Sequence, residues 1–159
     1  MKRLLIVVIP LAGIVALIAA VGASGAGSQT AEHETDGHAT ITVIEHAESD
    51  ATTDTGAQGD SAGDILTFAN PVFDAADRTQ VGTDQGFCIR IVPGSSYECT
   101  FTTLLDGGHI NVSGPFFETR PSTLAVTGGT GRYRDASGSM DLEVLAGGTK
   151  FRFTFRLSG

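Results

Sequence analysis

The segment from Val126 to Gly131 reads V-T-G-G-T-G and has the residue types of a phosphate-binding turn. In a dinucleotide-binding fold, such a turn carries a third glycine three residues on and opens a helix. Here Arg134 stands at that glycine position, and residues 132–138 lack an apolar repeat of helical period. A crossover helix and second parallel strand need about 30 residues, and only two short β-like runs follow. The segment therefore predicts a tight turn between antiparallel strands, where glycine supplies positive φ.

The chain has two cysteines, Cys88 and Cys99, which flank the turn signal Pro93-Gly94-Ser95-Ser96. A hairpin centred between Pro93 and Gly94 makes the cysteines direct cross-strand neighbours, with Cβ atoms about 4.5–5.5 Å apart. A small strand adjustment brings such a pair into disulfide range, so we expect a bridge. The alternative is a reactive free thiol. The same register places Arg90 opposite Tyr97 and Phe101 opposite Gly86, all on the cysteine face.

Short runs of β-branched and aromatic residues recur along the chain, separated by Gly, Pro and Asp turns. In the last run, Phe151 to Leu157, the period is two, so three phenylalanines face one side and the arginines the other. The predicted strands are residues 39–46, 64–70, 87–92, 97–105, 109–113, 122–127, 140–145 and 150–157. Residues 50–63 and the segment from Pro71 to Thr83 are predicted loops. About eight strands without a helix predict a closed antiparallel barrel or a sandwich, and an eight-stranded barrel can hold one small ligand.

Acidic residues dominate the charge of the chain, which is -8 overall. Residues 27–60 contain eight Asp or Glu and no Lys or Arg. Without a basic face, nucleic acid is not an expected partner. His33, His38 and His46 lie in or near this acidic stretch, and their irregular spacing favours solvated side chains over a metal site. We expect no metal and no cofactor.

The N-terminus has the pattern of an export signal. Lys2 and Arg3 precede a run of about 20 apolar residues, and small residues follow it. We expect residues 1–26 to be a signal peptide. An uncleaved anchor is the alternative, because the run is long enough to span a bilayer. Residues 27–38 are expected to be a disordered acidic leader, and residues 39–159 the barrel, secreted or otherwise extracytoplasmic.

A series of ordered motifs extends from about Gly63 to Leu157. They are Gly63-Asp64, Phe68-Ala69-Asn70, Val81-Gly82, Gly86-Phe87-Cys88, Tyr97-Glu98, Gly108-His109-Ile110, Gly114-Pro115-Phe116, Leu124 to Gly131, and the terminal Phe-Arg-Phe-Thr-Phe-Arg-Leu. In order and spacing, these motifs resemble the allene oxide cyclase family. The Val-Thr-Gly-Gly-Thr-Gly block is also similar to dirigent proteins. The resemblance implies an eight-stranded lipocalin-like barrel around an apolar cavity, often a homotrimer.

The resemblance transfers only some of the family's functional residues. Asn70 matches the asparagine that helps hold a water against the substrate epoxide, and Cys88 matches a cysteine lining the cavity. The family's catalytic glutamate lies on the first strand in a Glu-x-Asn pattern, whose two positions fall here on Thr42 and Ile44. That placement predicts a site without its carboxylate. The dirigent loop acid and arginine are likewise replaced, by Arg132 and Ser137. The expected ligand-binding residues are Phe68, Asn70, Arg90, Tyr97, Phe101 and Phe116, with Asn70 as the catalytic candidate.

Three functions remain open from the sequence. The first is a secreted barrel that binds a small hydrophobic molecule and steers its cyclisation or isomerisation, which needs a shaped, dry cavity and one orienting polar group. The second is a non-catalytic carrier, favoured by the missing glutamate. The third is a structural module at the cell surface. A homo-oligomer is the expected assembly, and the membrane is a partner only through an uncleaved N-terminal segment.

Overall fold

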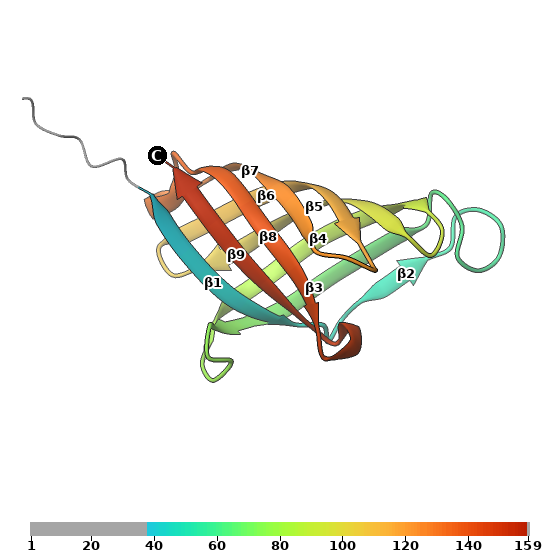
Figure 1. Cartoon of the computed structure of the whole chain (residues 1–159), viewed down its shortest axis with the longest axis horizontal. Coiled ribbons are helices and arrows are strands. Elements are labelled where there is room, and N and C mark those ends of the chain that lie inside the picture. The colour runs from blue at the N-terminus through green and yellow to red at the C-terminus, as the bar shows by residue number, and fades with distance from the viewer. Residues whose placement is uncertain (1–37, 159) are drawn as a thin grey trace, which may run out of the picture. The chain divides into compact units, whose positions relative to one another are not determined.

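A closed antiparallel β-barrel is the architecture of residues 38–158, the part of the chain that the computed structural model describes (Figure 1). Its wall runs in the order β1-β9-β8-β7-β6-β5-β4-β3, and pairing of β1 with β3 closes it. The strands are β1 (Ala39–His46), β2 (Ala51–Thr53), β3 (Ile65–Asp74), β4 (Gln80–Val92), β5 (Ser96–Leu105), β6 (Gly108–Phe117), β7 (Ser122–Gly129), β8 (Ser137–Leu145) and β9 (Lys150–Ser158). The predicted eight-stranded all-β barrel is thus confirmed, with β2 as an additional short strand paired to β3.

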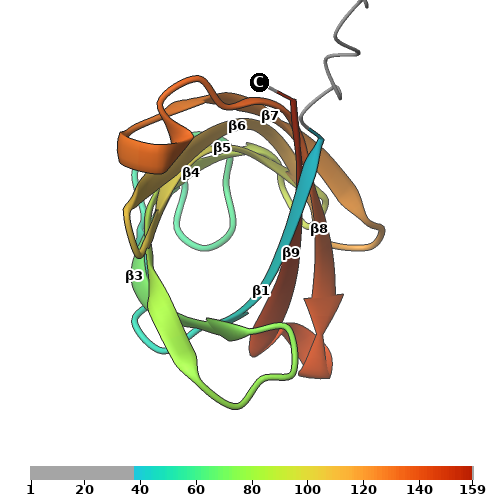
Figure 2. The same ribbon diagram turned by 90° about the vertical axis from the view of Figure 1, so that its left-hand side faces the viewer.

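Closure rests on a short ladder between β1 and β3, in which Val43, Ile44 and Glu45 lie opposite Asp74, Phe73 and Val72. Seen along the barrel, the strands form a continuous ring (Figure 2). Closing the sheet removes the exposed edges that an open sheet of this size would present. It also makes β1 and β3 neighbours, so inward side chains of the two strands lie side by side at the site described below.

Two prolines lie inside strands rather than ending them. We predicted that Pro71 would stop its strand, but β3 continues to Asp74. The reason is local: β3 pairs with β2 only up to Thr67 and with β1 only from Val72, so no partner on that edge needs an N–H at Pro71. Pro115 likewise lies in β6 beyond Ser113, where the ladder with β7 ends. The predicted loop from Pro71 to Thr83 therefore shrinks to residues 75–79.

The glycine-rich segment forms the predicted turn between antiparallel strands. It leads from β7 through the short 3-10 helix η1 (Gly131–Tyr133) into β8, so the structure contains no crossover helix here. Gly131 has φ 59°, and a Cβ on it would lie 2.0 Å from the carbonyl oxygen of Gly107. The glycines allow this turn to approach the β5–β6 turn closely, and the nucleotide-binding interpretation is excluded by the fold.

The core fills the barrel beside the site with large apolar side chains. Along β9 the predicted alternation holds: Phe153 and Phe155 are buried, whereas Arg156 is exposed. The fully buried side chains that surround them include Val72, Ile110, Val112, Leu124 and Met140. Burying a side chain of this size contributes about 1.5–3 kcal/mol.

The N-terminal expectations concern residues outside the described part. The signal peptide or anchor of residues 1–26, the acidic leader of residues 27–38 except His38, and His33 all lie there. Within residues 38–158, the helices are too short and too polar to cross a bilayer.

Candidate functional site

Cys88 on β4 and Cys99 on β5 form a disulfide, as the hairpin register predicted. They are directly opposed in the ladder, and their Cα atoms lie 4.0 Å apart. Arg90 faces Tyr97 and Gly86 faces Phe101 in the same register, which confirms the predicted pairing. The reactive-thiol alternative is therefore wrong, because both sulfur atoms are bonded and buried. The bridge forms part of an interior wall instead.

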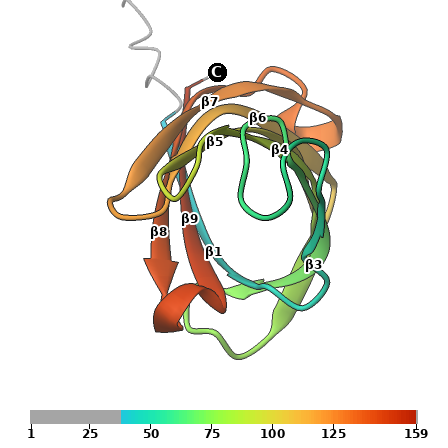
Figure 3. The ribbon, with the colours of Figure 1, turned by 90° about the vertical axis from the view of Figure 1, so that its right-hand side faces the viewer.

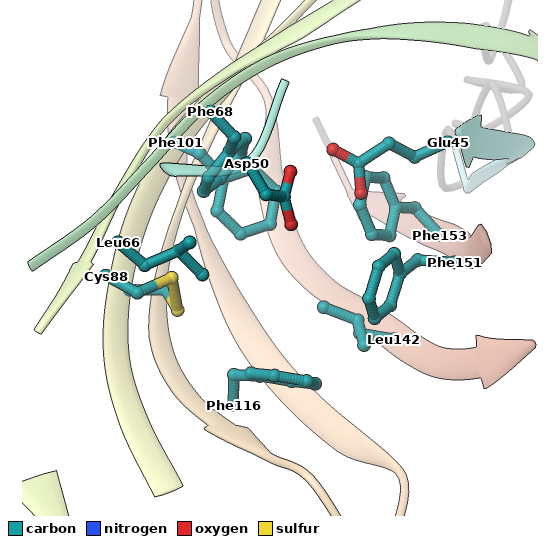
Figure 4. Close-up of a pocket in the computed structure, with 11 residues that line it drawn as sticks. Glu45, Asp50, Leu66, Phe68, Cys88, Phe101, Phe116, Leu142, Phe151 and Phe153 are labelled. Atoms are coloured by element: carbon teal, nitrogen blue, oxygen red, sulfur yellow. A yellow bond between two sulfur atoms is a disulfide. The ribbon is translucent and has the colours of Figure 1, made fainter. Parts of the chain in front are cut away.

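That wall belongs to a pocket inside the barrel (Figure 4). The cavity volume is about 40 Å³ when measured as the space open to the centre of a water molecule. All the empty space of the pocket, including its open mouth, amounts to about 370 Å³. One water needs about 10–15 Å³ on the first measure, so the interior has room for a molecule of roughly one ring. The lining residues are Glu45, Asp50, Leu66, Phe68, Cys88, Cys99, Phe101, Phe116, Leu142, Phe151 and Phe153.

Aromatic rings make up most of the pocket wall. Phe101 packs edge-on against Phe68 with ring centroids 5.8 Å apart, and tilted against Phe153 at 5.5 Å. Phe116 meets Phe151 edge-on at 6.0 Å. The five rings come from four strands that only the closed barrel brings together. A ligand in the pocket would be enclosed mainly by aromatic surface.

Asn70, 1% exposed on β3, connects the pocket's acidic residues. Its Oδ1 accepts hydrogen bonds from the backbone N–H groups of Glu48 (3.0 Å) and Ser49 (2.9 Å). These bonds fix the orientation of the amide, because only its oxygen can accept them. Its Nδ2 then donates to Glu45 Oε1 at 2.9 Å and to Asp50 Oδ1 at 2.8 Å. Asn70 thereby holds both carboxylates at the pocket.

Glu45 presents a buried carboxyl group to the pocket. Its side chain is 5% exposed, and Figure 4 shows its carboxylate and that of Asp50 turned toward each other. Burial raises the pKa of Glu45 from 4.5 to about 7, since the charged form loses its water. The hydrogen bond from Asn70 opposes this rise in pKa, and the charge of Asp50 adds to it. At neutral pH, Glu45 is therefore close to equally protonated and ionised.

Asp84 is a second buried carboxyl group beside Asn70. The two residues are directly opposed between β3 and β4, and Asp84 has no exposed surface. Thr103 Oγ1 donates to its Oδ1 at 2.8 Å, while its Oδ2 has no hydrogen-bond partner among the described residues. Burial, helped by repulsion from Glu45, raises the pKa of Asp84 well above its usual range. Burial therefore favours the neutral form of Asp84.

Arg90 and Tyr97 lie near the pocket but do not line it. The Arg90 guanidinium stacks on the Tyr97 ring at 3.7 Å, and Tyr97 stacks in turn on Phe116. Arg90 Nε lies 2.6 Å from Asp60 Oδ1, and Nη1 lies 2.9 Å from Glu118 Oε2. The guanidinium is thus committed to two carboxylates. Through Asp60, Arg90 ties the segment of residues 54–64 to one end of the barrel. Figures 1 and 3 show the segment at that end.

The structure brings most of the predicted site residues together. Phe68, Phe101 and Phe116 line the pocket, and Asn70 contacts it through Glu45 and Asp50. The predicted absence of a carboxylate is wrong. The family positions fall on Thr42 and Ile44, which alternate along β1 with Val43 and Glu45. Val43 and Glu45 lie opposite Phe153 and Phe151 of β9, and Glu45 lines the pocket with both phenylalanines. A shift of one residue along a strand exchanges the two faces, which is why sequence reasoning missed Glu45.

Comparison with known proteins gives the same architecture. The allene oxide cyclase family model matches residues 39–159. A solved structure of a pyocyanin demethylase is 29% identical, covering 75% of this chain and 99% of that one, with a TM-score of 0.66. A pterocarpan synthase dirigent protein (15% identical, 76% and 93% covered, TM-score 0.61) and a Diels–Alderase from Streptomyces koyangensis (17%, 79% and 70%, TM-score 0.64) share the fold. Because the family match spans the whole barrel, this chain belongs to the allene oxide cyclase family.

Proposed function

We propose that the protein binds a small, largely apolar molecule in the phenylalanine-lined pocket and promotes its isomerisation or cyclisation. Glu45 is the residue that faces the reacting atoms, and Asn70 positions it. One observation carries the proposal: a buried carboxyl group with a pKa near 7 opens into an aromatic pocket and is held by a buried amide. Structural residues of a filled barrel core have no need of such a group.

Binding follows from the lining. Five phenylalanines, two leucines and the disulfide offer an apolar surface from which water is readily displaced. Moving apolar ligand surface out of water contributes about 25 cal/mol per Å². The pocket is narrow, so a flexible substrate is confined to few conformations. That confinement favours a ring closure or a rearrangement whose reacting atoms must meet.

Catalysis would use the two protonation states of Glu45. The ionised form can accept a proton or stabilise positive charge that develops during bond rearrangement. The protonated form can donate to an oxygen of the substrate. A pKa near 7 keeps both forms populated at neutral pH, which is the condition that general acid–base catalysis favours. Asn70 keeps the carboxylate in place and is therefore a positioning residue.

The site is proposed to work outside the cytosol. The Cys88–Cys99 disulfide is of a kind that persists in oxidising compartments and is rare in the cytosol. The N-terminal pattern of Lys2, Arg3 and the apolar run supports the same location. Secretion and an uncleaved anchor both satisfy this proposal.

The test combines binding with product analysis. The purified protein is incubated with a panel of small conjugated epoxides and dienes whose spontaneous cyclisation in buffer gives racemic products. We expect a faster reaction and an unequal enantiomer ratio for at least one substrate. The Glu45→Gln variant, which keeps an acceptor for Asn70, should lose about 10²–10⁴-fold in rate while still binding that substrate.

Two results would change the assignment. If Glu45→Gln reacts at the unaltered rate, Glu45 is not catalytic. If substrates bind but products form only as fast and as racemic as in buffer, the protein is a carrier.

A further inference from the structure

The charges that face the pocket are all negative. Among the described residues that line it, Glu45 and Asp50 are the ionisable ones, and none is Lys, Arg or His. Asp84 lies one strand further from Glu45, and burial raises its pKa, which favours its uncharged form. A neutral apolar ligand would bury the ionised form of Glu45 further and would cover the exposed Asp50, in both cases without a counter-charge, which is costly. The pocket therefore has a charge that a neutral ligand does not satisfy.

Glu45 has unused hydrogen-bonding capacity directed at the ligand space. Oε1 accepts one bond, from Asn70, and none of the residues 38–158 donates a hydrogen bond to Oε2. The bases on neighbouring strands are engaged elsewhere. Arg90 binds Asp60 and Glu118, and Lys150 Nζ lies 2.5 Å from Asp77 Oδ2. The counter-charge for Glu45 is not supplied by those side chains.

The aromatic walls supply a second attraction for positive charge. The face of an aromatic ring carries negative electrostatic potential, and a cation within about 6 Å of a ring centroid is stabilised by it. Phe101, Phe151 and Phe153 line the same pocket as the two carboxylates. Aromatic rings on several sides and carboxylates at one end form the combination that binds quaternary ammonium groups in aromatic cages.

We infer that the ligand of this pocket is a small organic cation, with an alkylated ring nitrogen or quaternary ammonium group placed between the phenylalanines and the Glu45–Asp50 pair. This inference rests on the proposed function, because it names the chemical class that the same pocket accepts. A negative group at the Glu45–Asp50 end of the pocket is disfavoured, since it would face two carboxylates at close range.

A cation and a proton compete for Glu45. The groups that face it are Asp50, whose charge raises its pKa, Asn70, and the uncharged rings of β9, with Asp84 acting at longer range. Cation binding favours the ionised carboxylate. Affinity should therefore rise as pH increases through about 7, the pKa of Glu45 in the free protein. Near pH 7, binding should release up to about half a proton per protein.

A matched pair of probes isolates the charge. The 1-methylpyridinium ion and toluene are each a six-membered aromatic ring with one methyl group, are similar in size and shape, and differ by one positive charge. Binding of each to the full chain is measured by isothermal titration calorimetry at pH 5.5 and 8.5, with chloride as counter-ion. We expect the cation to bind at least about tenfold more tightly than toluene at pH 8.5, with that preference reduced at pH 5.5.

Two variants with the same chemical change serve as test and control. Glu45→Gln should remove the pH dependence and most of the preference for 1-methylpyridinium, while toluene binds as before or better. Glu98→Gln removes one carboxylate from the exposed face of β5 and should change neither the pH dependence nor the preference for 1-methylpyridinium. Titrations at pH 7 in buffers of different ionisation enthalpy report the proton release, which Glu45→Gln should abolish.

The outcomes separate this inference from the proposed function. Tighter binding of toluene than of 1-methylpyridinium at pH 8.5, or an equal effect of Glu98→Gln, overturns the cation inference and leaves an apolar-ligand pocket in place. Failure of both probes to bind overturns the pocket's ligand-binding role itself. Unchanged thermal unfolding of Glu45→Gln at pH 5.5 confirms that the variant is folded for the comparison.

Discussion

Asn70 Nδ2 donates to Glu45 Oε1 across 2.9 Å, from β3 to β1, at the seam where the barrel closes. The same amide binds Asp50 and the backbone of Glu48 and Ser49. One side chain thus bridges the strands at the closing seam and also places the acid. Stability and site chemistry are therefore coupled, and the predictions below separate them.

Asn70→Ala should lower the free energy of unfolding by roughly 2–4 kcal/mol, because buried donors and acceptors lose their partners. It should also raise the pKa of Glu45 further, since the Asn70 hydrogen bond is what lowers that pKa in the native site. Urea denaturation measures the first effect, and carboxyl-carbon NMR titration of Glu45 measures the second. Asn111→Ala, which removes one hydrogen bond with Thr102 on the partly buried surface, is the control and should cost less than about 1 kcal/mol.

Stability should fall as pH rises between about 4.5 and 7. The folded-state pKa of Glu45 is raised to about 7 from 4.5, so the folded protein holds a proton that the unfolded chain releases in this window. The stabilisation that Glu45 contributes is fully present below pH 4.5 and is lost above about pH 7. It amounts to about 3 kcal/mol. Glu45→Gln should abolish this dependence and be the more stable protein at pH 8.

Urea denaturation at several pH values between 4 and 8.5 tests this sign. A wild-type protein that gains stability relative to Glu45→Gln as pH rises would show that Glu45 is ionised at low pH in the folded state. Asp84 contributes in the same direction, since burial raises its pKa as well.

Reducing the Cys88–Cys99 bridge should lower the free energy of unfolding by about 3 kcal/mol, because the unfolded chain regains the freedom of the loop between them. Denaturation with and without reductant measures this change. The double variant Cys88→Ala/Cys99→Ala is the control and should be insensitive to reductant. Two cysteines alkylated by iodoacetamide in the folded, unreduced protein would contradict the bridge.

Asp60 should hold the segment of residues 54–64 at the barrel end. Its Oδ2 accepts the Gly94 N–H at 2.6 Å, and its Oδ1 lies beside Arg90. Asp60→Ala should therefore accelerate amide hydrogen exchange at Gly94. Asp54→Ala is the matched control, because Asp54 binds only the Gly59 N–H within this segment. If both variants leave Gly94 exchange unchanged, Asp60 does not restrain the segment.

Much of the fold could be predicted from local patterns. The alternation of Phe151, Phe153 and Phe155 gave the inward face of the last strand, and the turn after Pro93 gave the cysteine register. Both follow from interactions between residues near in sequence. The continuation of β3 through Pro71 could not be seen, because it depends on which neighbour leaves that edge unpaired.

The position of Glu45 shows where local patterns end. Val43, Ile44 and Glu45 are all buried, so alternation along β1 does not reveal which face is interior. Pairing with β9 decides it, by setting Glu45 opposite Phe151. Asp50 lies at the same pocket and accepts a hydrogen bond there from Asn70, 20 residues later in the sequence.

The sequence by itself determined the strands, the disulfide and the aromatic character of the interior, since each is encoded by the period-two pattern and by turns between adjacent strands. Only the tertiary structure decided that the pocket contains a carboxyl group and that its pKa is near 7. The physical reason is that desolvation depends on everything that surrounds a group, and the surroundings of Glu45 come from strands distant in sequence that meet when the barrel closes.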